Sequence, residues 1–233
     1  MPAPDPLALY KAVMGDAWGE DYQKAKVRKA EAVERTDRSY KRDGKPSVRN
    51  LAKKASGSRS AVFKRIRKGG CKTRKSLRTQ ISYVNDKAAL TFTNAMIRLG
   101  ETGQLSEGQK DSICDSWQDT WRGSSKLGFT SHMLLSFPPA VSVDQVRDIA
   151  MDWCEHFFES GHYEDTWDYF VAIHDDRENN HAHIILNNRG NDFGTWFSCW
   201  RDGIVSPQLM REVQADIAEK YGVVLELSLI NIS

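Results

Sequence analysis

The chain has 233 residues and a mass of 26.4 kDa, and 40% of its residues are hydrophobic and 27% charged. Such a chain can bury a substantial core, which excludes collagen-like, mucin-like and wholly disordered proteins. No run approaches the roughly 18 consecutive apolar residues of a membrane helix, and the N-terminal MPAPDPLALYKAV lacks the basic-then-apolar order of a signal peptide. We therefore expect a soluble, cytoplasmic protein with no membrane insertion.

The net charge of +2 conceals two oppositely charged parts. Residues 1–80 contain 22 Lys or Arg and 8 Asp or Glu, whereas residues 81–233 contain 11 and 23, so the net charges are +14 and −12. A basic segment of this kind is typical of a protein that binds a polyanion, most commonly nucleic acid, or of an internally neutralised interface. Charge alone does not choose between the two.

Four cysteines are spread along the chain about forty residues apart, and none belongs to the CxxC pair of a zinc or redox motif. They are Cys71, Cys114, Cys154 and Cys199. This spacing predicts reduced thiols with a structural role.

The first 58 residues differ in composition from the rest of the chain. A charged, helix-prone stretch is followed by RDGKPSVRNLAKKASGSRS, which combines glycine, proline and serine with many cations. We therefore expect a basic, partly helical arm and flexible linker over residues 1–58 and a folded domain over residues 59–233.

The folded part begins with AVFKRIRKGG, whose alternating pattern predicts a strand that stops at the turn Gly69-Gly70. A helix is expected next, because Leu77, Ile81 and Val84 keep helical spacing. This helix places Tyr83 near its end or just past it.

Further along, SHMLLSFP predicts a short strand, and SVDQVRDIAMDWCEHFFES predicts a helix capped by Ser142. The strands DYFVAIH and HAHIILN follow, separated by the polar segment 175–180, and SPQLMREVQADIAEKYG predicts an amphipathic helix that ends near Gly222. Strands interleaved with helices, two of them forming a hairpin, indicate a mainly antiparallel sheet with helices packed on it.

Three of the six histidines fall within ten residues, at His174, His181 and His183. His181 and His183 lie two residues apart on one strand, so their side chains share a face of the sheet. If residues 175–180 form the hairpin loop, His174 lies opposite His181, with Cβ atoms about 4.5–5.5 Å apart. Three imidazoles on one face predict a site for a divalent metal, which would retain its charge for an anionic substrate such as a phosphodiester.

The alternative is a hairpin whose histidines are half-buried or hydrogen-bonded to nearby carboxylates. Crowding three imidazoles lowers their pKa values and costs stability unless a cation occupies the cluster, so we favour the metal site.

These residues match a known family. HAHIILN, with two histidines around one residue, resembles the HUH endonucleases, and H-x6-H-x-H resembles their relaxase branch, the conjugative and mobilisation nickases. The stretches RIRKGGCKT, LRTQISYV and SHMLLSFP resemble the T-DNA border endonuclease group of relaxases, in the same order. The resemblance covers about residues 61–225 and leaves the basic arm outside it.

The resemblance implies an α+β fold, a two-layer sandwich with a central five-stranded, mainly antiparallel sheet and helices packed on it. By the same resemblance Tyr83 is the nucleophile, His174, His181 and His183 bind a divalent metal, Mg or Mn, and the product is a 5′-phosphotyrosyl DNA with a free 3′-hydroxyl. It also implies a catalytic role for His132, which would orient a ligand or the substrate; a buried strand histidine is the alternative.

Cations crowd the first strand, its turn and the start of the Tyr83 helix, whose N-terminus near Thr73 adds unpaired backbone donors. We expect this segment to bind the DNA backbone. Its cations are Lys64, Arg65, Arg67, Lys68, Lys72, Arg74, Lys75 and Arg78.

The sequence thus favours a metal-dependent nickase and strand transferase that acts on single-stranded DNA at an origin of transfer. The resemblance implies an accessory DNA-binding protein and a type IV secretion coupling protein as partners, and a bacterial cytoplasmic location with export alongside DNA. Three alternatives stay open: a rolling-circle replication initiator of the same superfamily, a non-catalytic DNA-binding module with a structural histidine cluster, and a hydrolytic metalloenzyme.

Overall fold

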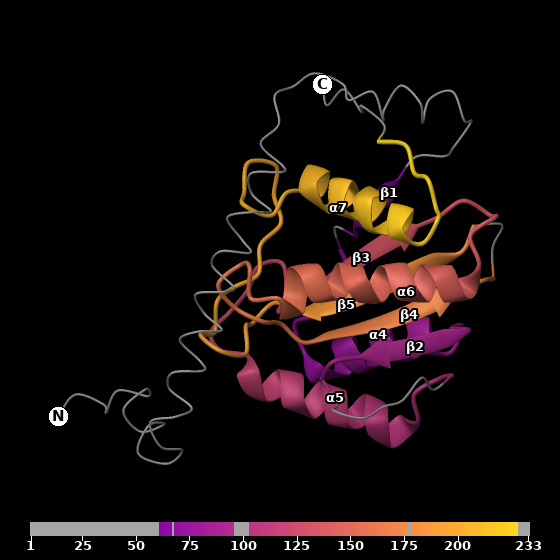
Figure 1. The fold of residues 1–233 in the computed structure, drawn as a ribbon. Coiled ribbons are helices and arrows are strands. Elements are labelled where there is room, and N and C mark those ends of the chain that lie inside the picture. Colours follow the sequence, from indigo (N-terminus) through magenta and orange to yellow (C-terminus); the bar gives the residue numbers. More distant parts are fainter. Residues whose placement is uncertain (1–60, 67, 96–102, 177–178, 228–233) are drawn as a thin grey trace, which may run out of the picture. The chain divides into compact units, whose positions relative to one another are not determined.

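The structure is a computed structural model that describes residues 61–66, 68–95, 103–176 and 179–227 (Figure 1). The expected arm and linker over residues 1–58 lie outside the described residues. The remainder of the expected domain, apart from the short gaps between these ranges, supplies the fold and the candidate site.

Five strands form one antiparallel sheet in the order β1-β3-β5-β4-β2. The strands are β1 (Val62–Arg65), β2 (Leu90–Thr93), β3 (Thr130–Ser136), β4 (Tyr169–His174) and β5 (His181–Asn187). The expected hairpin of β4 and β5 therefore lies at the centre of the sheet, with β5 as the middle strand. This confirms the α+β class and the five-stranded antiparallel sheet.

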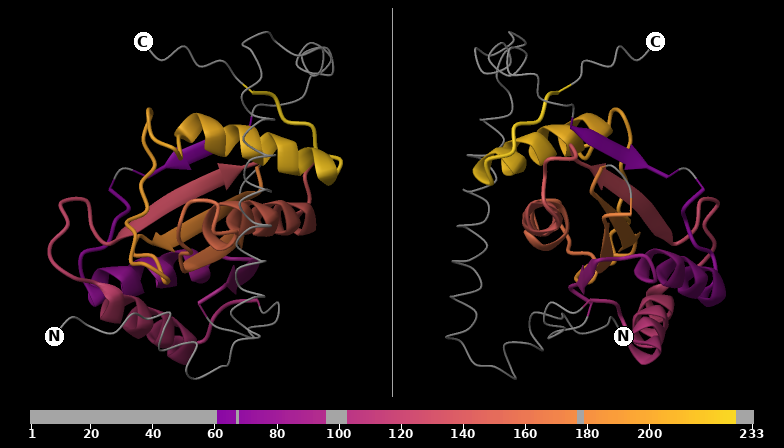
Figure 2. Two further views of the ribbon diagram at one scale, coloured as in Figure 1. Left: turned by 60° about the vertical axis from the view of Figure 1, so that its left-hand side comes forward. Right: turned by 90° about the vertical axis from the view of Figure 1, so that its right-hand side faces the viewer.

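Helices cover both faces of the sheet (Figures 1 and 2). One face carries α4 (Arg74–Asn85) and α5 (Glu107–Thr120), and the other carries α6 (Val143–Cys154) and α7 (Pro207–Lys220). Helix α6 continues into a short π-helix, Glu155–Glu159. The two-layer sandwich expected from the sequence is therefore corrected to three layers.

The physical reason for the third layer lies in the central strands. Val171 and Ile173 of β4 belong to the hydrophobic cluster under α6 and α7, whereas Phe170 and Ala172 belong to the cluster under α4 and α5. Side chains alternate between the faces of a strand, so a continuous apolar run such as YFVAI must be covered on both sides.

The helix ends follow the local sequence signals. Ser142 caps α6 with a capping box completed by Gln145, and Thr73 caps α4 in the same way with Ser76. Gly222 has a φ of 74° just after α7, a conformation that glycine adopts without steric cost. These local signals agree with the boundaries expected from the sequence.

Two elements were not expected. Strand β2 pairs with β4 through Leu90 opposite Ile173, and α5 packs on α4 through Trp117 and Ile113, both fully buried. Strand β2 has only four residues, and α5 is a mostly polar helix with few buried apolar side chains, so each depends on contacts made far along the chain.

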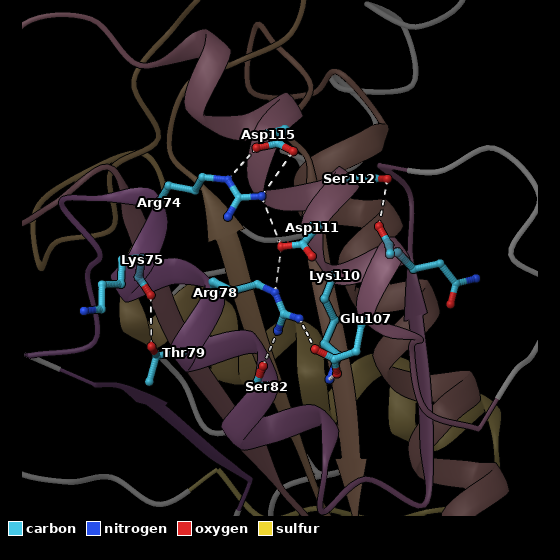
Figure 3. A network of polar contacts seen from close by, with 12 residues as sticks. Arg74, Lys75, Arg78, Thr79, Ser82, Glu107, Lys110, Asp111, Ser112 and Asp115 are labelled. Carbon is cyan, nitrogen blue, oxygen red and sulfur yellow. Dashed lines mark hydrogen bonds and ion pairs between the residues drawn. The ribbon is translucent and has the colours of Figure 1, made fainter.

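A network of ion pairs joins α4 to α5 (Figure 3). Arg74 reaches Asp115 and Asp111, and Arg78 reaches Asp111 (Nε to Oδ1, 2.9 Å) and Glu107. The hydrogen bond from Arg78 is the main cause of the lowered pKa of the Asp111 carboxyl. The network therefore orients α4 by shared charges as well as by apolar packing.

All four cysteine side chains are buried and none is in a disulfide, as the spacing predicts. Burial raises the pKa of Cys114 and of Cys199 to about 11, so these thiols stay protonated. Among the described helices, none has the length and apolar character needed to cross a bilayer.

Replacing Ile81 with alanine tests the packing of α4 on the sheet. Ile81 is fully buried among the residues under α4 and α5, so the truncation leaves a cavity and should lower the free energy of unfolding by about 2–5 kcal/mol. Urea unfolding followed by circular dichroism measures the change. The control is Thr79→Ala on the exposed side of the same helix, for which a change of about 0.5 kcal/mol or less is expected. Equal losses in the two variants would contradict this packing.

Candidate active site

The register of the central hairpin brings the three histidines together. His174 of β4 pairs directly with His181 of β5, and His183 follows two residues later on the same face. The ring centroids are 5.2 Å apart for His174 and His181, 4.7 Å for His174 and His183, and 5.2 Å for His181 and His183. One candidate ligand atom from each residue lies within 4.8 Å of the others, so the three can share one ion.

Hydrogen bonds orient the three rings. His174 Nε2 donates to the backbone oxygen of Val84 at 2.7 Å, and His181 Nδ1 donates to the backbone oxygen of Asn179 at 3.0 Å. His183 Nδ1 lies 2.9 Å from His132 Nε2. His174 Nε2 and His181 Nδ1 are the donors in these bonds, so the opposite nitrogen of each of these two rings is a candidate metal ligand.

This donor set fits a divalent ion. Imidazole nitrogens held by outer hydrogen bonds are ordinary ligands of transition metals, and neutral ligands leave the charge of the ion undiminished. His174 and His181 are 3% and 6% exposed, so these two rings are largely shielded from solvent. The three rings can therefore hold a cation in a sheltered position.

His132 lies on β3 opposite Ile185 of β5, on the face that carries the triad. Burial is the main cause that lowers its pKa to about 4, with a smaller effect of His174. Its Nδ1 lies 3.3 Å from Nε2 of Gln80, which also donates to the Gly69 oxygen at 2.9 Å. His132 thus contacts a candidate ligand, but it does not belong to the group of three histidines that could share one ion.

Gly69 and Gln80 are additions that the sequence did not single out for this site. A Cβ at position 69 would lie 2.5 Å from the Cβ of His132, so the turn after β1 can approach this histidine only with glycine. The Gly69-Gly70 turn was visible in the sequence, whereas its contact with His132 depends on the pairing of β1 and β3.

Tyr83 lies near the C-terminal end of α4, as expected, and its side chain is 59% exposed. It lines a cavity of about 500 Å³ together with His174, His181 and His183. The next residue, Val84, supplies the carbonyl that accepts from His174. One hydrogen bond therefore ties the backbone beside Tyr83 to the histidine cluster.

Two lysines enter the same cavity. Lys64 was predicted from the basic first strand, and its partner Leu134 on β3 is in turn paired with His183. Lys87 was not predicted; its Nζ lies 4.8 Å from the centroid of the Tyr83 ring. The cavity thus combines a phenol, three imidazoles and two ammonium groups with the carboxylate of Asp176.

The other predicted DNA-binding cations fall into different environments. Arg65 donates to the Cys199 oxygen and to Ser131, and Arg74 and Arg78 are ion-paired with α5. Lys68, Lys72 and Lys75 are exposed, and Arg67 lies outside the described residues. The DNA-binding role of all of them stays a prediction, and the lysines have the more accessible charges.

Comparison with known proteins gives the family of the chain. A family model described as "Relaxase: MobA/VirD2-like, nuclease domain" matches residues 83–223, more than half of the chain. The matched range begins at Tyr83 and includes His132 and the three clustered histidines.

Two curated relatives are T-DNA border endonucleases VirD2. The one from Rhizobium radiobacter is 26% identical over 179 residues, which cover 68% of this chain and 39% of the relative. The one from Rhizobium rhizogenes is 25% identical over 181 residues, covering 69% and 38%. This chain thus spans about two fifths of the length of these relatives.

A solved structure described as "Molecular Basis of Vancomycin Resistance Transfer in Staphylococcus aureus" is similar over 72% of this chain and 97% of that chain, with 16% identity and a TM-score of 0.43. The family match rests on the sequence of residues 83–223, which contains every histidine of the site. The chain belongs to the MobA/VirD2-like relaxases, with their nuclease domain as the matched part.

Proposed function

We propose that this chain nicks one strand of DNA at an origin of transfer and transfers the strand to Tyr83. The observation that carries the proposal is that Tyr83 and the three histidines line one cavity. The phenol is exposed while two of the imidazoles are buried, so a DNA strand can reach the nucleophile from solvent with the histidine cluster beneath it.

The reaction is an exchange of one phosphoester for another. The Tyr83 oxygen attacks the scissile phosphorus, a new O–P bond forms, and the bond from phosphorus to the 3′ oxygen breaks. The phenol proton passes to water, and the departing 3′ oxygen takes up a proton to become a hydroxyl. The 5′ end stays on Tyr83 as a phosphodiester of similar energy, so a 3′-hydroxyl can reverse the step and rejoin the strand.

His174, His181 and His183 would hold the divalent cofactor, Mg or Mn. When bound there, such an ion supplies charge that polarises phosphate oxygens during in-line displacement. His132 keeps its neutral form through burial and orients His183 through their shared hydrogen bond. The position of α4, fixed by the Val84 carbonyl and the ion pairs with α5, determines where the Tyr83 oxygen meets the strand.

Exposed cations near the site would bind the phosphates of the same strand. Lys64 lies in the cavity, and Lys68, Lys72 and Lys75 continue from the turn after β1 to the start of α4. The basic composition of residues 1–58 suits further contacts with DNA phosphates. We further propose that an accessory DNA-binding protein and a type IV secretion coupling protein act with the chain, which acts in the bacterial cytoplasm before export with the DNA.

Tyr83→Phe should abolish covalent attachment to DNA while leaving binding nearly unchanged, because only the nucleophilic oxygen is removed. The probe is a pool of labelled single-stranded oligonucleotides with a randomised segment, incubated with the protein and Mn²⁺. A denaturing gel separates covalent adducts, and sequencing the trapped strands identifies the cleaved site. Tyr221→Phe, after α7 on the opposite face, is the control and should form the adduct as the unchanged protein does. An adduct that persists in Tyr83→Phe would refute the assignment of the nucleophile, and cleavage without any trapped protein would favour a hydrolytic enzyme.

His183→Ala should weaken metal binding about 10- to 100-fold or more, since it removes one of three candidate ligands. Titration of the purified protein with Mn²⁺, followed by electron paramagnetic resonance of the unbound ion, gives the affinity without relying on activity. Excess Mn²⁺ should restore cleavage only poorly. The matched control is His162→Ala, at a histidine near His156 on the other face (ring centroids 5.7 Å apart), which should bind Mn²⁺ normally. Equal affinities in the two variants would exclude the histidine cluster as the metal site.

A further inference from the structure

We propose that Lys87 is a catalytic residue, whose ammonium group contacts the scissile phosphate and stabilises the negative charge that develops during attack by Tyr83. This inference rests on the proposed function and names a residue that neither the sequence motifs nor the family comparison single out. The family model covers position 87 without assigning it a role.

Lys87 lies close to the nucleophile. Its Nζ lies 4.8 Å from the centroid of the Tyr83 ring, and both side chains line the cavity that contains the histidine triad. An ammonium group over a phenol ring is attracted by the face of the ring, which keeps Lys87 close to the nucleophile. A phosphate bound between Tyr83 and the histidines would meet this group directly.

Hydrogen bonds hold the backbone that carries Lys87 in place. Just after α4, the amide of Ala88 donates to the oxygen of Asn85 at 3.0 Å, and the amide of Ala89 donates to the oxygen of Ile173 at 2.9 Å. Ile173 directly precedes His174. The turn that carries Lys87 is therefore tied on one side to the Tyr83 helix and on the other to the strand of a candidate ligand.

A further set of contacts holds this turn from α5 and from Leu105, just before that helix. The Asn85 side chain accepts from the Leu105 amide at 2.6 Å and donates to the Leu105 oxygen at 3.3 Å. Lys110, only 3% exposed, reaches Asp86 at 3.4 Å. The Asp86 carboxylate is thus directed to α5 and pairs there with a different lysine from Lys87.

The charge of the Lys87 ammonium group favours binding of an anion. Among the described residues, the ion pairs do not include Lys87, and its side chain is exposed. Its charge is therefore available to an incoming anion. Lys64 enters the cavity from β1, two strands away from His183. Two ammonium groups from opposite sides of the triad match a strand that carries phosphates on either side of the scissile bond.

The position of each lysine gives it a different role. A cation that only attracts the strand contributes equally to bound substrate and transition state, which changes affinity and not the chemical step. A donor placed where charge develops affects the step itself, typically by about 100- to 1,000-fold. We place Lys87, whose ammonium group lies over the ring of the nucleophile, in the second class.

The test uses three variants and the oligonucleotide recovered from the trapped pool. Lys87→Met keeps a long stem over the Tyr83 ring but removes the charge, and Lys87→Arg keeps the charge. Lys220→Met, at the exposed end of α7 on the other face of the sheet, is the matched control for loss of one lysine. Single-turnover formation of the covalent adduct gives the rate of the chemical step, and fluorescence anisotropy with the Tyr83→Phe background gives Kd.

We expect Lys87→Met to slow adduct formation about 100- to 1,000-fold, with Kd raised about fivefold or less. Lys87→Arg should recover most of the rate, and Lys220→Met should match the unchanged protein in rate. Methionine preserves the packing of the lysine stem, and arginine restores the charge. Recovery of the rate by arginine therefore shows that the charge is what matters.

Two results would overturn the inference. One is an unchanged rate in Lys87→Met, and the other is a loss that lies entirely in Kd, which would make Lys87 an ordinary contact to the DNA backbone. These outcomes differ from failure of the proposed function, in which the unchanged protein forms no adduct with any member of the pool and both proposals fall.

Discussion

The hydrogen-bonded register between the two central strands is the constraint on which the site depends. It sets His174 opposite His181, and the two-residue repeat of the strand adds His183 to the same face. A shift of one residue would send these side chains to the face under α6 and α7. The apolar residues that alternate with the histidines, such as Ala182 and Ile184, are fully buried there, so the same core packing that stabilises the sheet also fixes the metal site.

The second requirement is that a nucleophile from far upstream arrives at this face. Helix α4 is held there by Leu77 and Ile81 in the core, by the bond from His174 to the carbonyl of Val84, and by ion pairs with α5. Each isolated surface pair contributes little, but the shared carboxylates couple several pairs into one network. Tyr83 itself remains exposed on this fixed helix, which suits a residue that must meet a long DNA substrate.

The sequence was sufficient to predict the features that depend on residues close together in the chain. The histidine hairpin, the caps at Ser142 and Thr73, and the turn at Gly69 all follow from spacing within a few residues. The third layer of the fold and strand β2 could not be predicted in this way, because both depend on pairing between distant segments.

The sequence was likewise insufficient to predict which cations lie at the site. A count of cations gives Arg74 and Lys64 equal weight as DNA contacts, although the first is ion-paired with Asp115 and the second lines the cavity. Lys87 lies in an ordinary polar turn of the sequence, and only the folded chain brings it to the Tyr83 ring.

Diffraction from Mn²⁺-soaked crystals at the manganese absorption edge tests the central claim most directly. The account predicts one anomalous peak at roughly 2.0–2.4 Å from a nitrogen of each of the three histidines. A peak elsewhere, or rings that remain without an ion at saturating Mn²⁺, would contradict it.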